Sequence, residues 1–305
     1  TAEGQEVDKV LVDGEELYSD DPTIATRELP GVAVDKVQVY DKKSDHTTFT
    51  GIDDGQKTRT IDLKLKNNKK RGYFGKIEAG TDANKYWNNN VLLNAFKGQR
   101  KFAGYAIMSN TGKTGLDLYE SMAYDFLPTE DDYSASEGLP KGWSTGLLYA
   151  NQWNSVHANT GYQFNKLNNE LRSRTFSQYI LSDTTLYTTE TNNSFHSVNN
   201  HLVYGLYEFK IDSLSSINFT IRGSTQSAYS HANYVQSSFD NFFDTLALSD
   251  RQSVLNGNNQ TFRSAILWKQ KFKKLRRTLS ILARQSHSSG TSDGLYKRNN
   301  YYYEN

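Results

Sequence analysis

Two acidic stretches in the sequence carry the residue types that bind hard cations. Residues 128–137, PTEDDYSASE, could supply several carboxylate oxygens to Ca²⁺, which prefers such ligands. They lack the Asp-x-Asp-x-Asp-Gly spacing of a calcium loop, so the sequence favours a solvated loop. Asp53, Asp54 and Gly55 are explained equally well by turn chemistry. No metal site is predicted in either stretch.

The histidines are too scattered to form an obvious metal site. His196 and His201 are five residues apart and would therefore face opposite sides of a strand. His157 falls on the polar side of an alternating segment, where lining a wet lumen is the favoured interpretation. The six histidines are His46, His157, His196, His201, His231 and His287.

The strongest basic cluster is KQKFKKLRR, residues 269–277, in which Phe272 interrupts the charges and Trp268 precedes them. Such interleaving occurs on nucleic-acid-binding surfaces. The chain as a whole has 35 basic and 34 acidic residues, a net charge of +1, so it lacks the electrostatic footprint of a nucleic-acid-binding protein. The sequence favours a basic turn between two strands and predicts no nucleic-acid partner.

No motif of a known catalytic type is present. The sequence has no Gly-Lys-Ser/Thr loop, Gly-x-Ser-x-Gly elbow or His-Glu-x-x-His pair. It has no cysteine, which excludes disulfides, thiolate metal sites and cysteine nucleophiles. Paired carboxylates of the glycosidase kind can lie far apart in sequence, but nothing positive supports them. We therefore predict no enzyme activity and no cofactor.

The elements that must hold these residues are mainly β-strands. Aromatic residues make up 13% of the chain, which indicates a folded protein because disordered chains are poor in them. No run reaches the roughly 18 to 20 apolar residues of a membrane-spanning helix. Strands of a membrane barrel remain possible, since they bury only every second side chain in lipid.

From Lys69 onward, segments of about ten residues alternate between apolar and polar side chains. SVHANTGYQFN (155–165), SINFTIRGS (216–224) and TFRSAILWKQKF (261–272) are the clearest. This pattern predicts an antiparallel transmembrane β-barrel with one face toward lipid. The side chains predicted to face lipid are Tyr162, Phe164, Phe219, Ile221, Trp268 and Phe272.

The predicted connections between these strands alternate in length, as in a membrane barrel with short turns at one rim and long loops at the other. A soluble sandwich would have shorter strands. The short connections are residues 165–169, 211–216 and 273–277, predicted to be periplasmic. The long connections, of which the first is predicted to be extracellular, are residues 111–140, 181–199 and 230–258.

Residues 1–68 have a different character and are predicted to form a small α/β domain. A short apolar run ends at an Asp13-Gly14 turn, Asp21 and Pro22 could start a helix, and two alternating strands follow. The alternating apolar positions of the strands should form the core of this domain. They are Val12, Val37, Val39, Ile61 and Leu63.

Four pieces of the sequence carry a family resemblance. They are VLVDGEEL (10–17), LPGVAVDKVQVYDKKSD (29–45), FTGIDDGQKTRTIDLKLK (49–66) and KKRGYFGKIEAG (69–80). The first three resemble the plug of TonB-dependent outer-membrane receptors, in the divergent form of Bacteroidetes, and the fourth looks like a first barrel strand. The resemblance implies a plug at 1–68 and an incomplete barrel at 69–305, as a fragment of a longer receptor.

The resemblance also implies a function and a location. It points to an outer-membrane protein of a Gram-negative bacterium that binds and imports an unknown small nutrient ligand. Outer-membrane lipid and possibly a TonB-type energy transducer would be its partners. Two alternatives stay open: an outer-membrane β-barrel surface scaffold without active transport, and a soluble secreted β protein. The residues that contact a ligand are unknown from the sequence.

Overall fold

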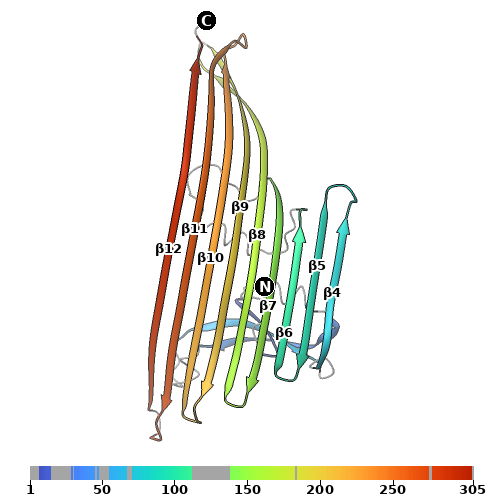
Figure 1. The fold of residues 1–305 in the computed structure, drawn as a ribbon, viewed down its shortest axis with the longest axis vertical. Helices are drawn as coiled ribbons and strands as arrows, with labels where there is room; N and C mark the ends of the chain where they lie inside the picture. The colour runs from blue at the N-terminus through green and yellow to red at the C-terminus, as the bar shows by residue number, and fades with distance from the viewer. Residues whose placement is uncertain are drawn as a thin grey trace.

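The chain is almost entirely β in a computed structural model, and its strands form two separate sheets (Figure 1). The structure describes residues 7–14, 29, 31–44, 47, 55–66, 71–111, 138–182, 184–274 and 277–303. Across these ranges, no helix has the length and apolar character needed to cross a membrane.

The first sheet is small and mixed. Its strands are β1 (Lys9–Val12), β2 (Val34–Lys43) and β3 (Lys57–Leu65), in the order β1-β3-β2. β1 runs parallel to β3, whereas β2 is antiparallel to it. A 3-10 turn, η1 (Gly31–Ala33), leads into β2. The predicted Asp13-Gly14 turn is present, with φ of 51° and 82°, but the predicted helix that starts at Asp21 lies outside the described residues apart from Leu29.

The second sheet is a nine-stranded antiparallel meander in which each strand pairs with its neighbours in sequence. β4 and β12 form its two edges, so the described sheet is open (Figure 1). The strands are β4 (Arg71–Thr81), β5 (Trp87–Lys97), β6 (Arg100–Ser109), β7 (Leu139–Trp153), β8 (Val156–Ile180), β9 (Thr185–Lys210), β10 (Ser215–Phe239), β11 (Thr245–Lys271) and β12 (Thr278–Tyr302).

The strands β8 to β12 are 25 to 27 residues long, which corrects the expectation of about ten. Residues 165–169 lie within β8 rather than in a turn, and most of 181–199 and 230–258 is strand. These stretches are rich in Asn, Ser and Thr on both faces. Alternation marks a strand only where one face is apolar, so a strand that is polar on both faces has no such signal.

The hairpin turns gather at two opposite ends of the large sheet (Figure 1). One end holds the turns at 98–99, 154–155 and 211–214 and the connection from β11 to β12, as alternation along a meander requires. Three turns begin with an aspartate whose Oδ1 accepts backbone N–H groups. These are Asp82, which binds the N–H groups of Asn84, Lys85 and Tyr86 at 2.8 to 2.9 Å, Asp212 and Asp240.

The two faces of the large sheet differ in chemistry, and the strand register shows which residues share a face. One cross-strand row runs Leu93, Gly104, Leu147, Tyr162, Val203, Gly223 and Phe262; we call its side the outer face. A row on the opposite, inner face runs Leu92, Tyr105, Gly146, Gln163, Leu202, Ser224 and Thr261. The outer row is mostly apolar, whereas the inner row becomes polar toward β10 and β11.

The small sheet packs against the inner face of β5 to β7. Val12 and Leu65 share one buried cluster with Leu92, Phe96 and Leu148 of the large sheet. Buried apolar area of this kind contributes about 25 cal/mol per Å², so it accounts for much of the attachment between the sheets. The inner face of β10 to β12 lies beyond this contact.

Candidate functional site

The five predicted core residues of the N-terminal region all lie in the small sheet, but they differ in burial. Val12 and Leu63 are buried, and Ile61 packs against the same cluster. Val37 and Val39 are 56% and 37% exposed. They lie on β2, an edge strand like β1, but unlike Val12 of β1 they do not belong to the buried cluster that joins the two sheets. The division into domains at residues 68 and 69 coincides with the gap between β3 and β4 and stays a prediction.

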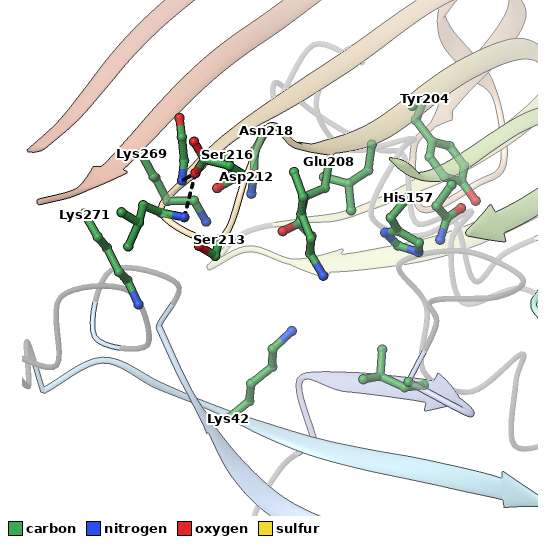
Figure 2. Close-up of a pocket in the computed structure, with 18 of the residues that line it drawn as sticks. Lys42, His157, Tyr204, Glu208, Asp212, Ser213, Ser216, Asn218, Lys269 and Lys271 are labelled. Atoms are coloured by element: carbon green, nitrogen blue, oxygen red, sulfur yellow. Dashed lines mark hydrogen bonds between the residues drawn. The ribbon is translucent and has the colours of Figure 1, made fainter. Parts of the chain in front are cut away.

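A cavity of about 750 Å³ lies between the small sheet and the inner face of the large sheet (Figure 2). Leu11 of β1 and Lys42 of β2 form one side of it, and Lys42 extends from its strand toward the opposite wall. That wall comes from β8 to β11 and from the turn at 211–214, and includes His157, Tyr204 and Asn218. We call this space the lysine cavity.

The lysine cavity carries an excess of positive charge. Its lining includes five lysines, Lys9, Lys42, Lys210, Lys269 and Lys271, against two carboxylates, Glu208 and Asp212. One of these carboxylates is already engaged, because Asp212 accepts the backbone N–H groups of Leu214 and Ser215 at 2.6 and 2.7 Å. The excess charge favours anions over cations in this space.

Part of the predicted basic turn lines this cavity. Lys269 and Lys271 belong to β11 and face inward, so the turn itself begins only at Phe272. The alternation around Trp268 and Phe272 already placed these two lysines on the polar side of the strand. His157, likewise on the polar side of its strand, also lines the cavity. What the sequence does not reveal is that Lys9 and Lys42, far away in the chain, complete the lining.

The outer face exposes large apolar side chains on most strands of the sheet. Extended exposed apolar patches on a protein mark surfaces that contact a partner or a membrane. Of the six side chains predicted to face lipid, the five within strands share this face, and Phe272 follows the end of β11. Exposed members of the face include Leu93, Phe102, Met108, Leu147, Trp153, Tyr162, Val203, Phe209, Phe262, Ile266 and Ile281.

The histidines and carboxylates considered as metal ligands do not form a metal site within the described residues. His196 and His201 do face opposite sides of β9, since His196 pairs with Asn169 of the inner face and His201 with Phe164 of the outer face. The Nδ1 of His201 lies 2.8 Å from the hydroxyl of Tyr162. Within the described ranges, no three His, Asp or Glu side chains are grouped to hold a metal ion. Residues 128–137, Asp53 and Asp54 lie outside those ranges.

Comparisons with known proteins find solved structures that are only weakly similar to this chain, among them the two described below. No protein-family model matches the chain, and no curated protein does so either. The siderophore receptor PiuA from Acinetobacter baumannii aligns with 95% of this chain at 8% identity and a TM-score of 0.23. The Ferric-Catecholate import receptor Fiu from E. coli K12 aligns with 97% of it at 7% identity and a TM-score of 0.25. The chain spans 55% and 60% of their lengths.

Proposed function

We propose that this chain is part of a TonB-dependent receptor-like protein of a Gram-negative outer membrane, which binds and imports a small nutrient ligand. The observation that carries the proposal is the apolar outer face, because its exposed side chains require a cover and run across nearly the whole sheet. Lipid supplies that cover for the strands of an outer-membrane barrel.

The remaining parts of the proposal follow from this placement. The large sheet would be a section of the barrel wall, with its inner face toward the lumen. The small sheet would be the plug, since it packs on that inner face. The protein would then need an energy transducer for import and would carry out no catalysis. These assignments agree with the resemblance of residues 10–80 to the receptor family.

Fractionation tests the location. The chain, expressed in a Gram-negative host with an outer-membrane leader, should sediment with the outer membrane and require detergent for extraction. Its folded form should migrate differently from the boiled form in electrophoresis. Recovery in the soluble fraction as a folded monomer would contradict the proposal and favour a secreted β protein.

A surface scaffold without active transport is a second candidate, favoured by one observation. The halves of β8 to β12 farthest from the small sheet carry mostly polar side chains on both faces, which suits water better than lipid on either side. Ligand uptake by cells separates the two functions. Import that stops when the proton gradient is collapsed supports the receptor, whereas surface binding without import supports the scaffold.

A further inference from the structure

Charged side chains of both signs, from both sheets, face the lysine cavity (Figure 2). Lys42 extends into it from β2 of the small sheet, whereas Glu208 and Lys210 belong to β9 of the large sheet. The other three lysines of the lining already take part in interactions within the structure. They are Lys9, Lys269 and Lys271. We therefore consider the charges of Lys42, Glu208 and Lys210 alone.

These three charged groups are not paired with one another. Within the described ranges, none of the three side chains forms a salt bridge. Glu208 is half-buried, whereas Lys42 and Lys210 are exposed, so that solutes can reach the lysines. A carboxylate that is partly removed from water gains stability when a cationic partner is supplied. The cavity therefore offers both an acceptor and donors to a ligand.

A neighbouring amide adds a second acceptor beside Glu208. Asn218 of β10 is the direct cross-strand partner of Glu208 and lines the same cavity. Its Oδ1 is buried without a hydrogen-bond donor. A buried acceptor in this state costs free energy, which an N–H group of a ligand can recover. Glu208 and Asn218 together suit a group with several donors, such as an ammonium.

The spacing along β9 matches a short peptide. Glu208 and Lys210 are two positions apart, so their side chains leave the strand on the same side, roughly 7 Å from each other. An extended dipeptide spans about the same length. The cavity volume of about 750 Å³ is also within the range of small-molecule sites. Both ends of such a peptide can therefore meet a charge of opposite sign.

We propose that the lysine cavity binds a small zwitterion, an amino acid or a short peptide. Its ammonium group contacts Glu208 and Asn218, and its carboxylate contacts Lys210 and Lys42 through charge-assisted hydrogen bonds. Because Lys42 belongs to the small sheet, the bound ligand connects the two sheets. The inference rests on the proposed function for its biological setting, in which this zwitterion is the imported nutrient.

Ligands with charge of one sign fit the cavity less well. A simple anion lacks the donor group that Glu208 and Asn218 require. A simple cation meets a lining that contains five lysines and two carboxylates. The same imbalance favours a zwitterion with an additional carboxylate. Alanyl-glutamate, which has one ammonium and two carboxylates, is therefore a suitable probe.

Calorimetric titration of the detergent-purified chain with alanyl-glutamate tests the proposal. Two analogues of the probe each lack one kind of charge: N-acetyl-alanyl-glutamate has no ammonium, and alanyl-glutamine amide has no carboxylate. Each should bind at least about tenfold more weakly than alanyl-glutamate.

Two variants connect these preferences to individual residues. Glu208→Gln should abolish the preference for alanyl-glutamate over the acetylated peptide, because the ammonium loses its carboxylate partner. Lys42→Gln should reduce the preference over the amide, and it changes an exposed side chain, so the fold is retained. Lys43→Gln is the matched control, since Lys43 is the next residue on β2 and lies outside the lining; it should bind as the parent does.

The outcomes for the site and for the location are separate. If the parent does not bind alanyl-glutamate, or binds the acetylated peptide equally well, the inference is wrong whichever fraction contains the chain. Equal weakening by Lys42→Gln and Lys43→Gln would also overturn it. The expected preferences in a chain that fractionates as soluble would support the site while refuting the outer-membrane location.

Discussion

The Nζ of Lys101 donates a 2.8 Å hydrogen bond to the main-chain carbonyl of Val12, and this buried contact joins the two sheets. Lys101 lies on the inner face of β6 and is only 5% exposed. Lys101→Met keeps the apolar stem but leaves the carbonyl without this donor, which should cost about 1 to 3 kcal/mol. Hydrogen exchange of residues 9–12 and 57–65 should accelerate. Lys97→Met, at an exposed position on the neighbouring strand, is the control and should leave exchange unchanged.

Val12 is buried and Val37 is exposed, so replacing each by aspartate should change the stability of the small sheet by very different amounts. Val12→Asp places an uncompensated charge at a fully buried position and should destabilise the small sheet by roughly 3 to 5 kcal/mol. Val37→Asp should change its stability by no more than about 0.5 kcal/mol, because water reaches that side chain. Hydrogen exchange in β3 measures both. Equal effects would show that β2 is covered in solution.

Neighbouring positions on β10 test which face meets lipid. Phe219→Arg puts a cation on the outer face and should cost roughly 2 to 4 kcal/mol if that face is in the bilayer. Asn218→Arg puts it on the inner face, opposite Glu208, and should be tolerated. The measurement is the fraction of heat-modifiable folded protein in the outer membrane. Similar tolerance of the two variants would argue against the membrane assignment.

A glycine on β8 makes room for Tyr204, which lines the lysine cavity. A Cβ at Gly161 would lie 2.6 Å from the ring Cζ of Tyr204, its cross-strand partner. Gly161→Ala should therefore displace the ring, cost about 1 to 3 kcal/mol and lower the melting temperature. At Gly223 the nearest atoms would lie 3.9 Å away, so Gly223→Ala should leave the melting temperature nearly unchanged.

The stability of the turn between β4 and β5 should decrease at acidic pH. Backbone N–H groups of Tyr86, Asn84 and Lys85 stabilise the ionised side chain of Asp82 and hold its pKa below its ordinary value of 3.8. Their contribution to the turn is complete at pH values above 3.8 and is lost as the pH falls through the lower, folded-state pKa. Amide exchange at 84–86, followed by NMR at acidic pH and in Asp82→Ala, measures this dependence.

Alternation in the sequence predicted the outer face well and other features poorly. It placed Tyr162, Phe164 and Phe219 together because one side of those strands is apolar and the other polar. It missed the far halves of β8 to β12, where most side chains on both sides are polar and alternation therefore gives little signal. It also could not show that Val12 packs against the large sheet whereas Val37 does not, because that depends on how the two sheets pack together.

The pairing of Arg222 with Arg263 could not be predicted from the sequence for a related reason. Arg222 and Arg263 are 41 positions apart in the chain, and only the register of β10 against β11 makes them neighbours. A shift of one residue would move one of them to the outer face. Register is set by the whole hairpin, including the turn at 240–244, rather than by any local motif.

The unequal strands give the large sheet a stepped rim. β4 to β6 have 10 or 11 residues, whereas β8 to β12 have 25 to 27, a difference of about 50 Å at 3.3 Å per residue (Figure 1). At the proposed location, β4 to β6 are long enough to cross the membrane, whereas β8 to β12 would extend well beyond it.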